Sequence, residues 1–194
     1  MEIALVNFFD ANYDEVGAIS VPNKRAYCAQ HGYDYILEHE ALDPTRPASW
    51  NKLKLMQQYI GQYQALFWND TDTLIMNPAI TLESLLLPQK PIIVGSDNWG
   101  INCGNFIIQN EPGIDAVLQE WWDKDDDVFH PWWEQKALMN LIATKSEWRD
   151  RIGIQPERKM NSHLIHYEDG DFLIHFAGFG RNKQNLIDIM KAWV

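Results

Sequence analysis

The chain has 194 residues, of which 46% are hydrophobic and 22% charged, a composition typical of one soluble globular domain with a substantial core. Its formal net charge of −11 disfavours attraction to nucleic acid or to an anionic membrane surface, so neither is expected as a partner. Because the sequence shows no apolar stretch of membrane-spanning length, no signal peptide and no lipidation motif, we expect a single domain over residues 1–194 without a membrane span.

The two cysteines, Cys28 and Cys103, are widely separated and too few to indicate a disulfide framework. We expect both to be free thiols in a reducing compartment, which predicts a cytoplasmic location. Nine tryptophans are many for this length, and most are expected to pack in the core because aromatic rings bury a large area. The pair Trp132 and Trp133 also allows a second interpretation, a flat apolar platform for a sugar ring.

The first forty residues predict a β-α-β unit. Ile3–Phe9 is a nearly continuous apolar run, as expected for a strand that is covered on both faces. A helical pattern follows from about Ser20 to Gln30, with Pro22 near its first turn and Gly32 in the C′ position after it. A short alternating strand comes next. This order implies a parallel sheet with a right-handed crossover and a Rossmann-like N-terminal half.

Polar residues follow the first predicted strand. In an open α/β sheet, ligands bind beyond the carboxyl ends of the strands, so the polar loop with Asp10, Asn12 and Asp14 is a candidate nucleotide contact. Ser49 is a predicted N-cap for a helix over residues 50–63. Lys52, near the start of that helix, is a candidate cation for a phosphate group.

The most informative motif is Asp70-Thr71-Asp72, which follows the apolar run Leu66–Trp68 closely. Carboxylates at positions i and i+2 share one face of an extended segment, and a tight turn could bring both toward one cation. Carboxylate oxygens suit Mn²⁺ or Mg²⁺, which need few protein ligands when phosphates fill the remaining positions. Phosphatases of the haloacid dehalogenase type also place Asp-x-Asp after a strand. That class is disfavoured because Leu74 stands where its pattern requires Thr or Val.

Later segments supply further candidates. Gly100 and Gly104 frame a segment rich in small and amide residues, where glycines allow close backbone approach to a ligand. Helices are predicted over residues 81–87, 112–122, 132–143 and 182–193, and a strand over residues 171–176. His175 lies at the end of that strand. Its imidazole, if brought beside the two aspartates, would complete a mixed oxygen and nitrogen site for a metal ion.

Seven segments carry a resemblance to a known family, in the same order along nearly the whole chain. They are Asn23-Lys24 with Tyr27 and His31-Gly32-Tyr33; Ser49-Trp50-Asn51-Lys52; Phe67-Trp68-Asn69-Asp70-Thr71-Asp72 with Asn77-Pro78; Gly100-Ile101-Asn102-Cys103-Gly104-Asn105-Phe106; Trp133-Glu134-Gln135; Asn161-Ser162; and Gly170-Asp171-Phe172 through His175-Phe176-Ala177-Gly178. With these segments the chain resembles the glycosyltransferases that include fungal α-1,2-galactosyltransferases and plant xyloglucan α-1,6-xylosyltransferases.

The resemblance implies a GT-A-type fold, an α/β protein built as a three-layer α/β/α sandwich with a mostly parallel central sheet. It implies a metal-dependent enzyme that uses Mn²⁺ or Mg²⁺ and moves a hexose or pentose from a UDP-sugar to a saccharide hydroxyl with retention of configuration. By the family pattern, the metal ligands are Asp70, Asp72 and His175, and Gln135 lies near the reactive face of the donor sugar. We add Glu134 to Gln135 as a catalytic candidate and expect the acceptor to approach over Trp132 and Trp133. The expected contacts of the nucleotide and donor sugar are Asn7, Asp10, Lys52, Asp70, Thr71, Asp72, Gly100, Asn102, Gly104, Gly178 and Arg181.

Departures from the family pattern leave other functions open. Glu134 replaces the usual Asp, Cys103 replaces the usual Thr, and the membrane anchor and stem of family members are not found in this sequence. One alternative is a nucleotide-sugar-binding protein without transfer activity, another is an inverting GT-A enzyme with a different donor, and a third is a structural domain that binds a divalent metal. A nucleotidyltransferase is disfavoured, because the loop after the first strand lacks the glycine-rich basic sequence that such enzymes need.

Overall fold

The computed structural model of the chain describes residues 2–194 and contains a six-stranded central sheet in the order β2-β1-β3-β6-β5-β7. Its strands are β1 (Ile3–Phe8), β2 (Asp34–Glu38), β3 (Ala65–Asn69), β5 (Ile92–Asp97), β6 (Gly100–Gln109) and β7 (Ile152–Gln155). Of these strands β6 alone is antiparallel to its neighbours, β3 and β5, while β1 is parallel to β2 and β3 and β5 is parallel to β7. The prediction of a mostly parallel central sheet is confirmed.

A second, three-stranded sheet joins distant parts of the chain. β4 (Thr73–Ile75) pairs antiparallel with β9 (Leu173–His175), and β9 pairs in parallel with β8 (Ser162–His163). Thr73, the residue after Asp72, lies opposite His175 in this sheet. The register therefore brings the histidine beside the aspartates, although they are far apart in the sequence.

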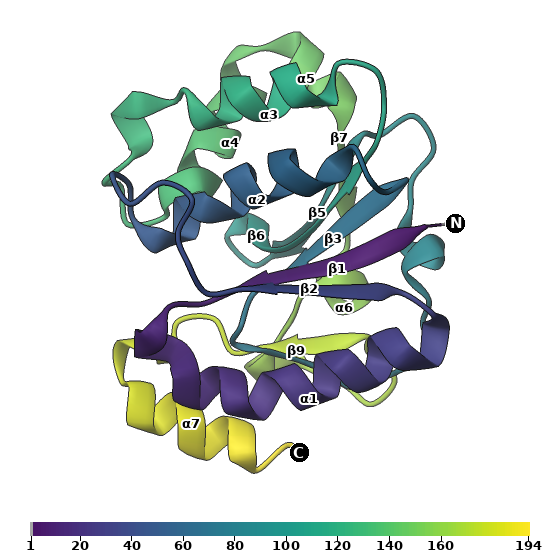
Figure 1. Cartoon of the computed structure of the whole chain (residues 1–194), viewed down its shortest axis with the longest axis vertical. Coiled ribbons are helices and arrows are strands. Elements are labelled where there is room, and N and C mark those ends of the chain that lie inside the picture. The colour runs from purple at the N-terminus through teal and green to yellow at the C-terminus, as the bar shows by residue number, and fades with distance from the viewer. Residues whose placement is uncertain (1) are drawn as a thin grey trace.

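Helices cover both faces of the central sheet (Figure 1). On one side lie α2 (Asn51–Ile60), α3 (Ile114–Trp122), α4 (Trp133–Thr144) and α5 (Ser146–Arg151). On the other side lie the second sheet, α1 (Asp14–His31) and α7 (Lys183–Lys191), and the short α6 (Glu157–Met160) contacts β5. This is the three-layer α/β/α arrangement that the family resemblance implies.

The central sheet divides the hydrophobic core into two parts. Val6 and Trp68 belong to the part under α2, α3 and α4, whereas their chain neighbours Leu5 and Phe67 belong to the part on the opposite face. Successive side chains of a strand point to opposite faces of its sheet. Since both faces of β1 and β3 are covered, both strands read as continuous apolar runs in the sequence.

Helix α1 begins earlier than the sequence predicted, at Asp14 instead of residue 20. Pro22 therefore lies in the helix interior, where its missing N–H removes one intrahelical hydrogen bond, and not near the first turn. The early start follows from a short 3-10 helix, Ala11–Tyr13, which Asp10 caps and which leads directly into α1. The predicted end is right, because Gly32 adopts a left-handed conformation with φ 71°.

Other helix boundaries also differ from the predictions. α2 begins at Asn51 after a 3-10 helix, Ala48–Trp50, so Ser49 lies in that turn and makes no capping hydrogen bond. The segment predicted as a helix over residues 81–87 is a 3-10 helix, Leu82–Leu85, capped by Thr81. Further 3-10 helices are Asp125–Asp127, Leu164–His166 and Phe179–Arg181.

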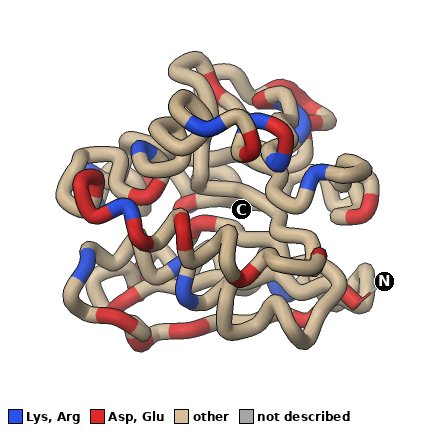
Figure 2. The backbone as a smooth tube through the Cα atoms, turned by 90° about the horizontal axis from the view of Figure 1, so that it is seen from above, with Lys and Arg blue, Asp and Glu red and all other residues tan. Residues whose placement is uncertain are grey.

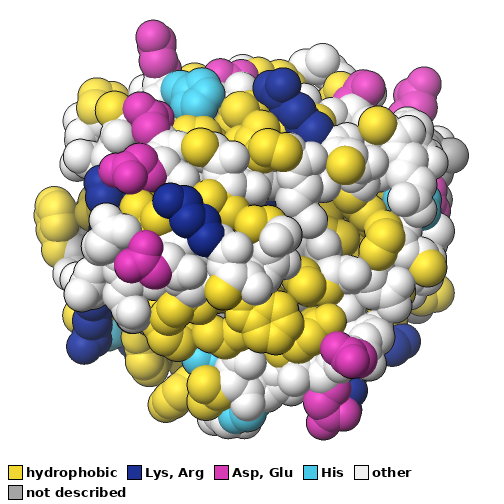
Figure 3. All heavy atoms as spheres, turned by 90° about the horizontal axis from the view of Figure 1, so that it is seen from below, with side chains coloured by type: hydrophobic (Ala, Val, Ile, Leu, Met, Phe, Trp, Pro, Cys, Tyr) yellow, Lys and Arg dark blue, Asp and Glu magenta, His cyan; other side chains and the backbone are white. Residues whose placement is uncertain are grey.

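Charged and hydrophobic residues are both distributed over the surface. Acidic residues outnumber basic ones by 27 to 16 and occur on all sides of the tube in Figure 2, with basic positions among them. Seen from below, hydrophobic atoms gather in a band between polar ones (Figure 3), and the exposed hydrophobic residues of the chain include Trp193 and Val194 after α7. Cys28 and Cys103 are free, as predicted, and both are buried, whereas the cellular location stays a prediction. Within residues 2–194, none of the helices combines the length and apolar character needed to span a membrane.

Candidate active site

A cleft of about 340 Å³ opens at the carboxyl ends of β1 and β3, the usual ligand position in an open α/β sheet. Its walls come from the turns after β1 and β3 and from the first residues of α2 and α4. The lining residues are Phe8, Phe9, Asp10, Asn12, Tyr13, Ala48, Ser49, Lys52, Trp68, Asp70, Thr71, Asp72 and Trp133. The predicted nucleotide and donor contacts that this cleft brings together are Asp10, Lys52, Asp70, Thr71 and Asp72.

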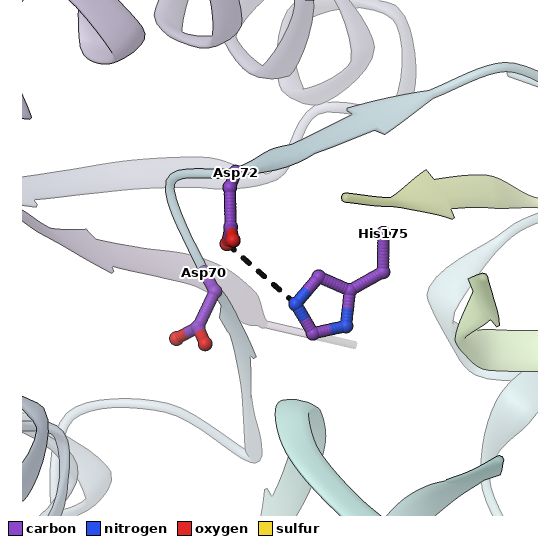
Figure 4. Close-up of side chains that lie close together, drawn as sticks. All are labelled: Asp70, Asp72 and His175. Atoms are coloured by element: carbon purple, nitrogen blue, oxygen red, sulfur yellow. Dashed lines mark ion pairs between the residues drawn. The ribbon is translucent and has the colours of Figure 1, made fainter. Parts of the chain in front are cut away.

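Asp70, Asp72 and His175 lie together beside the cleft (Figure 4). One potential ligand atom of each residue lies within 4.8 Å of the other two. His175 approaches from β9, and its Nε2 is 3.6 Å from Asp72 Oδ1. The structure thus brings together the three residues predicted to bind a metal, and two carboxylates with one imidazole are a donor set suited to Mn²⁺ or Mg²⁺.

Gly104 makes room for the imidazole. A Cβ atom added to Gly104 would lie 2.2 Å from His175 Cε1, a distance that side chains do not tolerate. The backbone oxygen of Gly104 accepts a hydrogen bond of 2.8 Å from the backbone N–H of Asp70. β6 therefore contacts both the aspartate turn and the histidine, and only glycine leaves the space that the histidine fills.

A row of buried polar side chains orients His175. Its Nδ1 lies 2.8 Å from Asn161 Oδ1, which also accepts a hydrogen bond from Asn105 Nδ2. Asn69 Nδ2 donates in turn to Asn105 Oδ1, and Thr73 Oγ1 donates to Asn69 Oδ1. Because an amide oxygen only accepts, this arrangement places the proton of a neutral imidazole on Nδ1. Nε2 then presents its lone pair toward the aspartates.

The charges of the cluster shift the pKa values of Asp72 and His175. Burial raises the pKa of Asp72, but His175 and Lys24 lower it, and the net shift is downward. Burial lowers the pKa of His175, but Asp72 and Asp70 raise it, and the net shift is upward. A cation bound at the cluster would compete with a proton for His175 Nε2. The donor chemistry and the orientation of the imidazole therefore fit a divalent metal ion.

Asp70 is fixed on three sides. Trp68 Nε1 donates to its Oδ1 at 2.6 Å, and Lys52 Nζ donates to the same oxygen at 3.2 Å. Lys24 Nζ donates to the backbone oxygen of Asp70 at 2.6 Å from the opposite layer. Burial lowers the pKa of Lys24 to about 7, although Asp70 and Asp72 raise it. Two buried lysines therefore hold the turn that carries the aspartates.

Lys52 and Glu134 form a buried ion pair. Only 4% of each side chain is exposed, and Lys52 Nζ lies 2.8 Å from Glu134 Oε1. Lys52 Nζ also donates to the backbone oxygen of Cys103, and the Ser49 hydroxyl donates to Glu134 Oε2 at 2.5 Å. Burial lowers the pKa of Lys52, but Asp70 and Glu134 raise it, and the net shift is upward. The lysine is therefore charged at neutral pH.

Two predicted residues are not part of the cleft lining, Asn7 and Gln135. Asn7 is fully buried, and its Nδ2 donates to the backbone oxygen of Asn69 and to Thr71 Oγ1. It supports the aspartate turn from behind and does not line the cleft. Gln135 Oε1 accepts a hydrogen bond of 3.0 Å from the backbone N–H of Cys103, which ties the first turn of α4 to β6.

Other predicted donor contacts lie outside the cleft lining. Gly100 and Asn102 belong to β6, and Asn102 Nδ2 donates to Asp97 Oδ2. Gly178, with φ 82°, precedes the 3-10 helix that contains the exposed Arg181. Trp133 lines the cleft, whereas Trp132 does not, although both are partly exposed.

Several residues with clear positions at the site had no separate role in the sequence-based prediction. Lys24 shares the buried face of α1 with Ser20, Tyr27 and Cys28, and a lysine at helical spacing among buried residues is a signal that could have been used. Asn161 gave no comparable signal, because its contact with His175 depends on the pairing of β8 with β9.

Comparison with known proteins places the chain among sugar transferases. The model of the galactosyl transferase GMA12/MNN10 family matches residues 5–91 and 88–185. A probable α-1,6-mannosyltransferase, MNN10, of Saccharomyces cerevisiae is 25% identical over 228 aligned positions, which cover 86% of this chain and 57% of the relative. An uncharacterised α-1,2-galactosyltransferase of Schizosaccharomyces pombe is 27% identical over 208 positions, covering 81% and 55%. The chain therefore spans little more than half the length of these curated relatives.

Solved structures confirm the fold. A glycosyltransferase involved in the glycosylation of the major capsid of PBCV-1 aligns with a TM-score of 0.80 at 16% identity, over 99% of this chain and all of the other. A Drosophila β1,4-galactosyltransferase 7 variant, in complex with manganese, UDP-Gal and xylobiose, aligns with a TM-score of 0.51 at 11% identity, over 94% of this chain and 74% of the other. The fold is the expected GT-A type, and the chain belongs to the galactosyl transferase GMA12/MNN10 family.

Proposed function

We propose that this domain is a metal-dependent glycosyltransferase that moves a hexose or pentose from a UDP-sugar to a saccharide hydroxyl. The observation that carries the proposal is the convergence of Asp70, Asp72 and His175 beside a cleft at the carboxyl ends of the strands. Membership of the family supports sugar transfer as the reaction. The curated relatives are named for different sugars, mannose and galactose, so the donor sugar is left open.

The metal would be Mn²⁺ or Mg²⁺, held by Asp70, Asp72 and His175. When bound, such a cation supplies positive charge that stabilises the nucleoside diphosphate as it leaves. The contact of His175 Nδ1 with Asn161 Oδ1 supports this assignment, because it directs the proton of a neutral imidazole to Nδ1 and leaves the Nε2 lone pair for a metal. Manganese in the Drosophila neighbour supports the same class of ion.

The UDP part of the donor would occupy the cleft, beside Asp10 and Thr71. A further positive contact for its phosphates would come from Arg181 or Lys183. The turn that carries Arg181 reaches the cleft wall, since a Cβ on Gly180 would lie 2.7 Å from the Tyr13 hydroxyl.

Gln135 would face the reacting carbon of the donor sugar. Its Oε1 is held by the Cys103 N–H and has a second lone pair, which could stabilise oxocarbenium-like charge. The acceptor hydroxyl would approach over Trp133 and replace the phosphate oxygen on the same face, so that configuration is retained. Its proton would pass to the departing phosphate.

Calorimetry with UDP tests the proposal. Wild-type protein should bind UDP with Mn²⁺ present and lose that binding in EDTA, and Asp72→Ala should lose it even with Mn²⁺. Asp188→Ala, an exposed aspartate on α7, is the matched control and should bind as wild type does. Equal UDP binding with and without chelator would overturn the metal assignment.

A donor and acceptor screen separates transfer from binding alone. UDP-sugars should raise the unfolding temperature in the presence of Mn²⁺, because a ligand that binds the folded state stabilises it. The stabilising donor is then offered to a panel of saccharides, with product detected by mass spectrometry. Binding of a UDP-sugar without transfer to any acceptor would favour the nucleotide-sugar-binding protein instead.

A further inference from the structure

We propose that Lys52 and Glu134 form a pair that positions Asp70. Lys52, held by Glu134, donates a hydrogen bond to Asp70 Oδ1, and Asp70 Oδ2 is left for the ligand. The proposal rests on the proposed function, because Asp70 is taken there as a metal ligand. It replaces the two roles expected from the sequence, a phosphate contact at Lys52 and a catalytic carboxylate at Glu134. The buried ion pair between the two residues is the starting observation.

Lys52 has no N–H left for a phosphate. Its ammonium carries three hydrogens, and three protein acceptors surround it: Asp70 Oδ1 at 3.2 Å, Glu134 Oε1 at 2.8 Å and the backbone oxygen of Cys103 at 3.1 Å. Its positive charge faces two carboxylates. Although Lys52 lines the cleft, both its hydrogen bonds and its charge are already satisfied by the protein.

Glu134 is satisfied in the same way. One oxygen accepts from Lys52 and the other from the Ser49 hydroxyl, and the side chain is almost fully buried. To reach a sugar, the Glu134 carboxylate would have to break its contacts with both donors. The buried ammonium of Lys52 would then have Asp70 as its only carboxylate partner. A buried ion pair that loses one partner leaves an uncompensated charge, which is strongly unfavourable. Glu134 is therefore suited to hold Lys52 and unsuited to act as nucleophile or base.

The pair determines which oxygen of the Asp70 carboxylate is hydrogen-bonded to the protein. Among residues 2–194, both hydrogen bonds to the Asp70 carboxylate fall on Oδ1, one from Trp68 Nε1 and one from Lys52 Nζ. The side chain is 29% exposed, so the carboxylate reaches the cleft with Oδ2 as its uncommitted oxygen. The pair thereby sets both the orientation of Asp70 and the number of oxygens that it offers.

The pair also connects the two sides of the cleft. Lys52 lies in the first turn of α2 and Glu134 in the first turn of α4, next to Trp133. Trp133 lines the cleft and has a strained backbone with φ 39°. Because Trp133 and Glu134 are consecutive, the proposed acceptor side is held at a fixed place relative to Asp70.

A double-mutant cycle tests the pair. The variants are Lys52→Met, Glu134→Gln and the double variant Lys52→Met/Glu134→Gln. Glu120→Gln is the matched control, since Glu120 forms an ion pair with Lys145 on the surface away from the cleft lining. Mn²⁺ affinity is measured by electron paramagnetic resonance with and without UDP, beside kcat and KM for the donor.

Each single variant should weaken Mn²⁺ binding about 10–100-fold, the usual effect of losing a residue that orients a metal ligand. The double variant should be no weaker than the weaker single variant, because the two residues act as one unit. Glu120→Gln should be unchanged. A catalytic Glu134 would behave differently: Glu134→Gln would keep wild-type Mn²⁺ and UDP affinity and lose only kcat, and that result would overturn the proposal.

A crystal structure of the metal-free double variant gives a second readout, independent of activity. The Asp70 carboxylate should rotate or become disordered while the Trp68 and Asp72 backbones stay in place. An Asp70 side chain unmoved in that crystal would contradict the positioning role. If the wild-type protein binds no UDP with Mn²⁺, the proposed function fails, yet the orientation of Asp70 in these crystals still decides whether the pair positions it.

Discussion

The imidazole of His175 packs against the backbone of Gly104 with no space for a methyl group between them. The two residues come from different sheets, β9 in the small sheet and β6 in the central one. Their contact fixes the distance between the sheets at the point where the candidate metal ligands meet. A glycine in the middle of a strand is costly in conformational entropy, so its presence here marks a close approach.

Gly104→Ala should displace His175 and weaken Mn²⁺-dependent UDP binding at least about 10-fold, as expected for a misplaced metal ligand. The new Cβ would lie 2.2 Å from Cε1, so the ring must move. Calorimetry with UDP and Mn²⁺ measures the loss. Gly61→Ala, where no atom lies within 4 Å of the added Cβ, is the control. Wild-type affinity in Gly104→Ala would mean that His175 does not bind the metal.

Asn161→Ala should reduce metal affinity about 10–100-fold, because the residue fixes the tautomer and orientation of His175. The substitution also leaves Asn105 Nδ2 without its acceptor in a buried place, which should cost about 1–3 kcal/mol of unfolding free energy. Electron paramagnetic resonance and denaturant unfolding measure the two effects. Asn140→Ala, which breaks hydrogen bonds to Asp127 instead, should leave metal binding intact.

Lys24 should make the unfolding free energy of the metal-free protein depend on pH. Burial lowers its pKa to about 7 in the folded chain, against about 10.4 in the unfolded chain. Above pH 7 the unfolded state therefore binds more protons at this residue, and its contribution to stability rises with pH. Lys24→Met removes the contribution. Denaturant unfolding in EDTA gives the unfolding free energies of the wild type and of the variant. From pH 7 to 8.5 the wild-type value should rise relative to that of the variant by at most about 1.4 kcal/mol per pH unit. A pH-independent difference would show that Lys24 stays charged in the fold.

Trp133→Ala should raise KM for a saccharide acceptor and leave UDP affinity in Mn²⁺ nearly unchanged. The indole lines the cleft and is 41% exposed, as a stacking surface for a sugar must be. Initial rates at varied acceptor concentration give the effect. Trp193→Ala, which removes an indole packed against Tyr167 near the C-terminus, is the control. If Trp133→Ala raised only the UDP dissociation constant and left KM for the acceptor unchanged, Trp133 would be a contact of the donor and not of the acceptor.

Much of the fold could be predicted from the sequence because its signals are local. The apolar runs at Ile3–Phe9 and Leu66–Trp68 correspond to the buried strands β1 and β3 of the central sheet, as their lack of alternation indicated. The aspartates after the second run and His175 at the end of β9 are close together, as metal-ligand chemistry and the family resemblance implied. The positions of these residues at strand ends, and their oxygen and nitrogen donor atoms, were enough to predict the three candidate metal ligands.

The rest depends on tertiary contacts that leave no local pattern. Lys52 looked like a helix lysine free to meet a phosphate, and its true partners, Asp70 and Glu134, come from two other elements. Ser49 had the residue type of an N-cap, yet its hydroxyl binds Glu134 across the cleft wall. The early start of α1 likewise required the 3-10 turn before it, which the polar sequence did not distinguish from a loop.

The small sheet makes His175 the last of the three candidate metal ligands to appear as the chain is made. The central sheet is complete with β7 at Gln155, whereas β8 and β9 follow it. A chain that stops after β7 would contain both aspartates, Lys24, Lys52 and every strand of the central sheet, but neither His175 nor Asn161. If the proposed metal site forms, it requires a chain that has been made and folded through β9, and a bound ion would tie the small sheet to the turn after β3.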